Sequence, residues 1–179
     1  GAIFTSPARP FYQSVTLINL APISLEKYQV FCQTHFERNG KSLDGDVVPQ
    51  LYERFEGITS YMQRTMNVLY TMTQKGSLCT CDMIDIAIKE LLDFSSDTYE
   101  TLLYQMPEKQ RALFVAIASA GKAKTINGSE FVRKYHLSSA SSVASAAKGL
   151  LEKDFITNDR GTYQVYDLFF KLWLQKTRL

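Results

Sequence analysis

The chain has 179 residues, of which 45% are hydrophobic and 21% charged, and its net charge at neutral pH is +2. This length holds one domain or two small ones, and the composition is that of an ordinary globular protein. No run of 18 apolar residues occurs in the sequence, so no transmembrane helix is predicted. The three cysteines, Cys32, Cys79 and Cys81, are too few for a disulfide framework and indicate reduced thiols in a cytoplasmic protein.

Charge is unevenly distributed along the chain. Residues 107–179 hold 12 Lys/Arg and 6 Asp/Glu, a net charge of +6, whereas residues 1–106 hold 8 and 12, a net charge of −4. A basic half attached to an acidic half indicates two domains. It also makes the second half the better candidate for binding a polyanion.

The beginning of the chain contains two β-like runs, residues 2–6 and 14–20. Pro7 and Pro10 exclude regular structure between them. Two short strands do not form a stable sheet alone. We therefore expect residues 2–20 to fold back on the helices that follow or to associate with a second copy of the chain.

Residues 23–106 have the pattern of a five-helix bundle. Apolar residues recur at helical spacing in five segments, and the segments are separated by residues that begin or end helices. Ser24, Thr59 and Asp82 are expected to cap three of these helices. The predicted helices run over residues 25–39, from Asp44 or Asp46 to Gly57, over residues 60–73, over residues 83–93, and from Ser95 or Ser96 to Met106.

Residues 107–179 give, in order, three helices, a two-stranded hairpin and a last helix, which is the order of a winged helix. The predicted fold class is therefore mainly α, a five-helix bundle followed by a winged-helix domain. The predicted elements are a helix from Pro107 to Gly121, a short helix over residues 130–135 capped by Ser129, a helix from Ser138 or Ser139 to Leu151, a hairpin over residues 155–166 with its turn at Asn158–Gly161, and a helix over residues 168–175 capped by Asp167.

The sequence lacks the known motifs of nucleotide binding and catalysis. No GxxxxGK[ST] motif occurs, and Gly121-Lys122 lacks the strand and glycine loop that cradle a phosphate. This chain is therefore predicted to be no enzyme and to hold no cofactor. His35 lies three residues after Cys32 and could suit a metal, but no second pair completes four ligands, so a packed histidine is the better interpretation. No metal site and no catalytic residues are predicted.

One predicted surface could bind nucleic acid or a protein partner. The polar side of the third winged-helix helix carries Ser141, Ser142, Ser145 and Lys148, which could bond phosphates or base edges. Its other candidate contacts are Arg133 and Lys134 on the preceding helix and Arg160 at the hairpin tip. Three uses remain open: sequence-specific reading of DNA, weak or non-specific DNA contact, and docking of a protein. The polar side has no Arg, Asn or Gln to read bases, and this favours protein docking.

Several stretches of the sequence share their order and residue pattern with one known family. These are Ile3–Gln13 with Leu17–Ile23, then Tyr52–Gln63, and finally Ser139–Val143, Leu150–Ile156, Tyr163–Asp167 and Phe170–Leu174. In order, they are similar to the end of the nucleotide-binding core, to part of the helical lid and to the closing winged helix of prokaryotic AAA+/STAND-type ATPases of the archaeal ATPase group. The sequence thus resembles the C-terminal region of these ATPases.

The resemblance implies three parts: a remnant of the core at residues 1–22, a lid domain at 23–106 and a winged-helix domain at 107–179. The parent would be a bacterial ATPase whose missing N-terminal nucleotide-binding core, the first partner of this chain, binds ATP and Mg²⁺. Gly57 and Thr59 would lie near the nucleotide in that parent. The lid would sense the state of the nucleotide, and the winged helix would pass it to a protein partner or DNA.

Two other functions fit the sequence. One is a self-contained winged-helix transcription regulator that binds DNA and uses its helical half as a sensor or dimeriser. The other is a module that only binds other proteins. We expect no membrane partner for any of the three.

Overall fold

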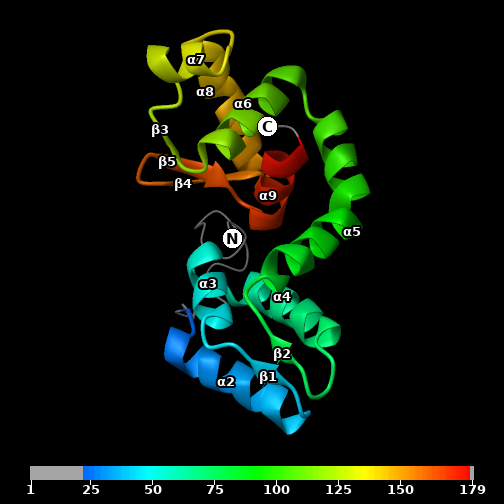
Figure 1. Cartoon of the computed structure of the whole chain (residues 1–179). Coiled ribbons are helices and arrows are strands. Elements are labelled where there is room, and N and C mark those ends of the chain that lie inside the picture. The colour runs from blue at the N-terminus through cyan, green and yellow to red at the C-terminus, as the bar shows by residue number, and fades with distance from the viewer. Residues whose placement is uncertain (1–21, 178–179) are drawn as a thin grey trace, which may run out of the picture.

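The computed structural model describes residues 22–177, which contain eight helices and five short strands (Figure 1). The first half contains α2 (Leu25–Arg38), β1 (Ser42–Leu43), α3 (Val47–Arg54), α4 (Thr59–Met72), β2 (Leu78–Cys79) and α5 (Met83–Gln105). The second half contains α6 (Glu108–Ala120), β3 (Ala123–Lys124), α7 (Ser129–Lys134), α8 (Ala140–Glu152), β4 (Ile156–Asp159), β5 (Thr162–Val165) and α9 (Leu168–Thr177). The strands predicted at residues 2–6 and 14–20, and the self-association predicted for residues 2–20, lie outside the described residues.

The first half differs from the predicted five-helix bundle, because residues 83–105 form one continuous helix, α5, of 23 residues. The prediction that Ser95 or Ser96 begins a new helix is wrong. No Gly or Pro interrupts residues 83–105, so nothing in the backbone forces a break. Ser96 lies within α5 and contacts α9 instead, because its Oγ accepts a hydrogen bond of 3.0 Å from Trp173 Nε1. The helix ends at Gln105, because Pro107 disfavours helical geometry at the residue before it, Met106.

Two segments expected to be loops pair as a small parallel sheet. Ser42 lies opposite Leu78, and Leu43 lies opposite Cys79. Each strand has only two residues, so neither gives the alternating pattern by which a strand is recognised from sequence. The pairing fastens the loop after α2 to the loop after α4.

The second half has the predicted order of three helices, a hairpin and a last helix. It also has a third strand that the sequence did not indicate: β3 pairs with β5, so the sheet order is β3-β5-β4 and all pairs are antiparallel. The hairpin is confirmed, but its turn is tighter than predicted, since Asp159 already pairs with Thr162. Arg160 and Gly161 form the two-residue loop with φ values of 48° and 84°. Positive φ at both central residues is what a type I′ hairpin turn requires.

Several helix ends differ from the prediction by one residue. Thr59 and Ser129 begin their helices rather than precede them, whereas Pro107 precedes α6 instead of opening it. The predicted caps Ser139 and Asp167 accept backbone hydrogen bonds. Ser24 and Asp82 occupy the predicted N-cap positions, but their side chains accept no capping hydrogen bond. The buried residues of the two halves form one continuous hydrophobic cluster. In Figure 1, α5 runs along one side of the molecule from the first half to the second.

Replacing Ser139 with alanine is expected to lower the free energy of unfolding by about 1 kcal/mol. Ser139 Oγ accepts a hydrogen bond of 3.2 Å from the Ser142 amide at the start of α8, and alanine leaves that amide without this partner. Urea denaturation measures the loss. Ser138→Ala is the control, because Ser138 is exposed and lies one residue before the cap. Equal effects of the two substitutions would contradict the capping role.

Candidate functional site

The exposed face of α8 carries mostly short side chains. Ser141, Ser145 and Lys148 are exposed, and Ser142 is half-buried. Lys148 Nζ lies 3.9 Å from Glu152 Oε1, so the only cation on α8 has a carboxylate beside it. Two serine hydroxyls and one partly neutralised lysine provide few groups for reading base edges, which needs long or bidentate donors.

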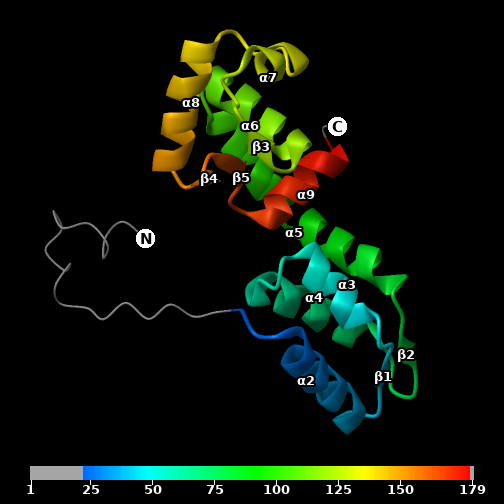
Figure 2. The ribbon, with the colours of Figure 1, turned by 90° about the vertical axis from the view of Figure 1, so that its left-hand side faces the viewer.

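The other predicted contact residues lie toward opposite ends of α8. Arg133 and Lys134 are exposed in the last turn of α7, and Lys134 Nζ lies 5.2 Å from the centre of the Tyr135 ring. Arg160 is exposed in the hairpin turn. Figure 2 shows α7 beside the start of α8 and the β4–β5 hairpin beside its end. The structure therefore spreads these cations along the winged-helix domain instead of gathering them at one point.

The two residues predicted to lie near a nucleotide, Gly57 and Thr59, occupy the turn between α3 and α4. Gly57 has φ +71° and is buried under the Tyr52 ring, where an added Cβ would lie 2.8 Å from Tyr52 Cζ. The Tyr52 hydroxyl in turn donates a hydrogen bond of 3.0 Å to the Ile23 carbonyl. Glycine at position 57 thus has a structural reason in this chain. Thr59 is half-buried and is the first residue of α4.

This same turn contacts the winged-helix domain through aromatic rings. Phe169 of α9 lies edge-on to Phe55 and Tyr61, with ring centroids 5.5 Å and 5.0 Å apart. Arg64 places its guanidinium carbon 4.7 Å from the centre of the Phe169 ring. Phe55 and Phe169 are almost fully buried. We call this set of residues, Phe55, Tyr61 and Phe169, the aromatic joint.

Polar contacts support the aromatic joint. The Tyr61 hydroxyl accepts a hydrogen bond of 3.1 Å from the Leu168 amide and lies 3.4 Å from Asp167 Oδ1. The same Asp167 oxygen accepts from the amides of Phe169 and Phe170, so it caps α9. Asp167 therefore fixes the start of α9 at the point where Tyr61 meets it.

An ion pair joins the same turn to a second segment of the winged-helix domain. Glu56 Oε1 lies 2.8 Å from Lys122 Nζ, and Lys122 directly precedes β3. Both side chains are about half exposed, so the pair contributes little stability by itself. Together with the aromatic joint, it connects the α3–α4 turn to both α9 and the β3 segment.

The second half of α5 packs on α9 next to the joint. Tyr99 stacks on Phe170 with ring centroids 4.4 Å apart and also contacts the Trp173 ring. The Tyr99 hydroxyl lies 3.5 Å from Asp167 Oδ2. Burial, together with the charge of Asp167, raises the pKa of Tyr99 to about 12. Burial also raises the pKa of Tyr61.

These pKa shifts predict a loss of stability in alkali. A tyrosine in the unfolded chain loses its proton near pH 10, whereas Tyr99 keeps it to about pH 12 in the folded chain. The contribution is complete below the unfolded pKa and is lost as the pH rises through the folded pKa. The free energy of unfolding should therefore fall between about pH 10 and pH 12, and less steeply in a Tyr99→Phe variant. Urea denaturation followed by the fluorescence of Trp173, the single tryptophan of the chain, measures both slopes. Equal slopes in the two proteins would contradict the assignment to Tyr99.

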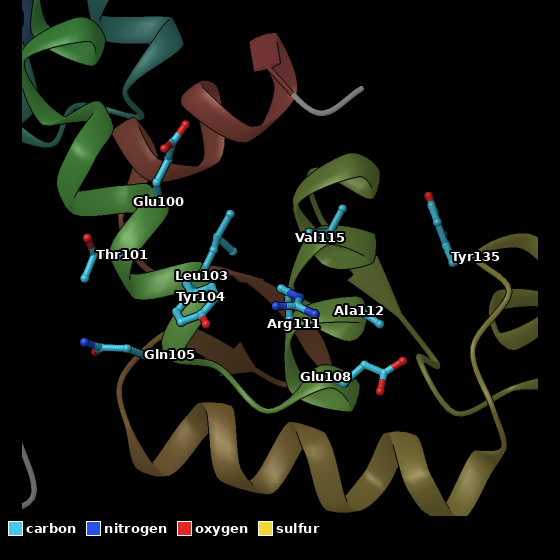
Figure 3. Close-up of a pocket in the computed structure, with 10 residues that line it drawn as sticks. All are labelled: Glu100, Thr101, Leu103, Tyr104, Gln105, Glu108, Arg111, Ala112, Val115 and Tyr135. Carbon is cyan, nitrogen blue, oxygen red and sulfur yellow. The ribbon is translucent and has the colours of Figure 1, made fainter.

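A groove opens where α5, α6 and α7 approach one another. It has a volume of about 990 Å³ and an apolar floor that includes Leu103 and Val115. Figure 3 shows Glu100 and Tyr104 reaching it from α5, Glu108 and Arg111 from α6, and Tyr135 from the side of α7. Sequence reasoning did not indicate this groove, because its walls come from three helices that meet only in the folded chain.

Two features are absent from residues 22–177: a cluster that could hold a metal ion and a helix that could cross a membrane. No group of three or more His, Cys, Asp or Glu in residues 22–177 is arranged to hold a metal ion. Cys32 is buried beside Tyr28, whereas His35 is exposed and stacks on Phe31. None of the helices in this range has both the length and the apolar character needed to cross a bilayer.

Comparison with known families supports the fold assigned to the second half of the chain. Residues 97–176 match a family model described as a probable winged helix domain. The match begins inside α5, before Pro107, and extends into α9. No curated protein and no solved structure is significantly similar to the chain. The chain therefore contains a winged-helix domain, whose close packing on the end of α5 agrees with where the match begins.

Proposed function

We propose that this chain is the non-catalytic C-terminal region of a bacterial ATP-binding protein of the STAND/AAA+ kind. Its helical half responds to the state of the nucleotide, and its winged-helix domain docks a protein partner. The nucleotide-binding core would precede the chain and would supply ATP, Mg²⁺ and hydrolysis.

The contact between the α3–α4 turn and α9 is the observation that carries this proposal. The resemblance implies that Gly57 and Thr59 lie near the nucleotide. Phe55 and Tyr61, on either side of them, touch the winged-helix domain at Phe169. A shift of this turn by a bound nucleotide would therefore bear directly on α9. Such coupling requires a packed contact that can adopt two arrangements. The nucleotide site and the partner site must each favour one of these arrangements over the other.

The surface of α8 supports a protein as the docked partner. Ser141 and Ser145 are short, and Lys148 lies beside Glu152, so the face has little positive charge. A helix face with short side chains and little net charge can pack closely on another protein, whereas DNA binding depends on several free cations.

The experiment uses the whole protein, with its core, in hydrogen exchange with and without an ATP analogue. We expect nucleotide binding to change protection at residues 55–61 and 167–170 together. Tyr61→Phe removes the hydroxyl that accepts from the Leu168 amide, and it should weaken the response at 167–170 while the response at the start of the 55–61 segment remains. Tyr166→Phe is the matched control, since its side chain is largely exposed. A whole protein that binds no nucleotide, or a response at 55–61 without one at 167–170, would contradict the proposal.

A second candidate function is DNA binding by a self-contained regulator. It is favoured by the net charge of +6 on residues 107–179 and by the exposed cations Arg133, Lys134 and Arg160. Contact with about five phosphates would give a salt slope of about −4.5, and affinity would fall roughly 500-fold between about 50 and 200 mM salt. Fluorescence anisotropy with a random duplex measures this slope. Arg133→Ala with Arg160→Ala should reduce the slope by about 2, whereas Lys75→Ala, in the other half of the chain, should leave it unchanged. Absence of binding at low salt would discard this candidate.

A further inference from the structure

The solvent side of α5 combines exposed aromatic and acidic side chains. Phe94 and Tyr104 are 89% and 86% exposed, values that are unusual for side chains of this size. Glu90 and Asp97 are exposed on the same side of the helix, and neither forms an ion pair within the described residues. We call Glu90, Phe94, Asp97, Glu100 and Tyr104 the α5 face.

The solvent side of α2 combines an exposed aromatic ring with basic side chains. Phe31 is 64% exposed and Val30 is 61% exposed. Lys27 and Arg38 are exposed on the same side as Phe31, and neither is in an ion pair within residues 22–177. We call Lys27, Val30, Phe31 and Arg38 the α2 face.

The two faces match in spacing and are opposite in charge. Lys27 lies four residues before Phe31, and Glu90 lies four residues before Phe94. Arg38 lies seven residues after Phe31. When the two helices are aligned in parallel, Arg38 is therefore level with Thr101, which follows Glu100 in the sequence. Helical positions at such intervals fall on one side of a helix. We propose that the α2 face of one copy docks along the α5 face of a second copy, with the helices parallel and Phe31 against Phe94.

In this pairing, the last turn of the incoming α2 lies at the groove beside Glu100. The groove is lined by Glu100 and Glu108, with Arg111 as the single cation (Figure 3). In the proposed register, Arg38 of the incoming α2 reaches this groove, whose lining carries two carboxylates and one guanidinium. Lys27 meets Glu90 at the other end. Because the two faces differ, the contact is head-to-tail, and each copy keeps one face for a further copy unless the assembly closes.

The test reverses the charge of one face at a time in the full chain. The α5 variant carries Glu90→Lys and Glu100→Lys, and the α2 variant carries Lys27→Glu and Arg38→Glu. All four positions are exposed, so both variants should fold, and circular dichroism checks this. Sedimentation velocity over a range of protein concentrations measures the mass. The wild-type chain should associate increasingly with concentration, and each variant alone should associate at least roughly tenfold more weakly, because like charges then meet.

Rescue decides between this pairing and other causes of association. An equimolar mixture of the two variants should associate like the wild type, and so should one chain that carries all four substitutions. A wild-type chain that stays monomeric, variants that associate unchanged, or a mixture without rescue would each overturn the proposal. Association that depends on residues 1–21 and ignores both reversals would overturn it as well.

Discussion

Truncating Phe169 to alanine is expected to lower the free energy of unfolding by about 3–5 kcal/mol. The Phe169 ring is 1% exposed and packs edge-on against both Phe55 and Tyr61, so its loss leaves a cavity where the two halves meet. The cost adds the lost burial of the ring to the cavity that remains. Urea denaturation followed by circular dichroism and by the fluorescence of Trp173 measures the change.

The same substitution should also reduce cooperativity. The two halves share one buried cluster, and the aromatic joint is part of it. Without Phe169, we expect unfolding to separate into two transitions, with Trp173 reporting only that of the winged-helix domain. Phe94→Ala is the matched control, because that ring is 89% exposed and its loss should change stability by less than about 0.5 kcal/mol. Equal effects of Phe169→Ala and Phe94→Ala would refute the role of the joint.

Replacing Gly57 with alanine is expected to cost about 2–4 kcal/mol. Two penalties add at this position. The φ value of +71° is unfavourable for any residue with a Cβ, and the added Cβ would lie 2.8 Å from the Tyr52 ring. Tyr52 cannot move away freely, since its hydroxyl is bonded to the Ile23 carbonyl. Thermal or urea denaturation gives the loss.

Two other glycines separate the penalties at Gly57. Gly161 has φ +84° with no atom within 4 Å of its added Cβ, so Gly161→Ala should show only the backbone cost of about 1–2 kcal/mol. Gly45 has neither a positive φ nor a neighbour within 4 Å, so Gly45→Ala should be nearly neutral. If Gly57→Ala lowered the free energy of unfolding by no more than Gly161→Ala does, the predicted cost of the contact with Tyr52 would be wrong.

Much of the fold could be predicted from the sequence because its signals are local. Val143, Ala147 and Leu150 recur at helical spacing in the sequence of α8, and all three are buried. Asp167 accepts from backbone amides at the start of α9, as its place before an apolar run indicates. The hairpin is found around Gly161 because a glycine in a tight turn is a strong local signal.

What the sequence could not give depends on partners far along the chain. Ser96 resembles a helix cap in sequence, yet it lies inside α5 and is bonded to Trp173, 77 residues away. The strand β3 has only two residues and exists because β5 lies beside it. The aromatic joint follows the same rule: Phe55, Tyr61 and Phe169 are ordinary apolar positions until folding brings α3, α4 and α9 together. The sequence identified the exposed cations of the winged-helix domain, but it could not show that they lie toward opposite ends of α8.

The unbroken course of α5 has a mechanical consequence. Its 23 residues form a rod about 35 Å long at 1.5 Å per residue. Ile84 and Ile88 anchor one end within the helical half, while Tyr99 and Leu103 anchor the other near α9. An unbroken helix that packs on both halves works as a lever arm, so a tilt of about 10° at its base would swing the far end by about 6 Å. A hinge at Ser95-Ser96 would have absorbed such a tilt, whereas a rod without one delivers it as displacement.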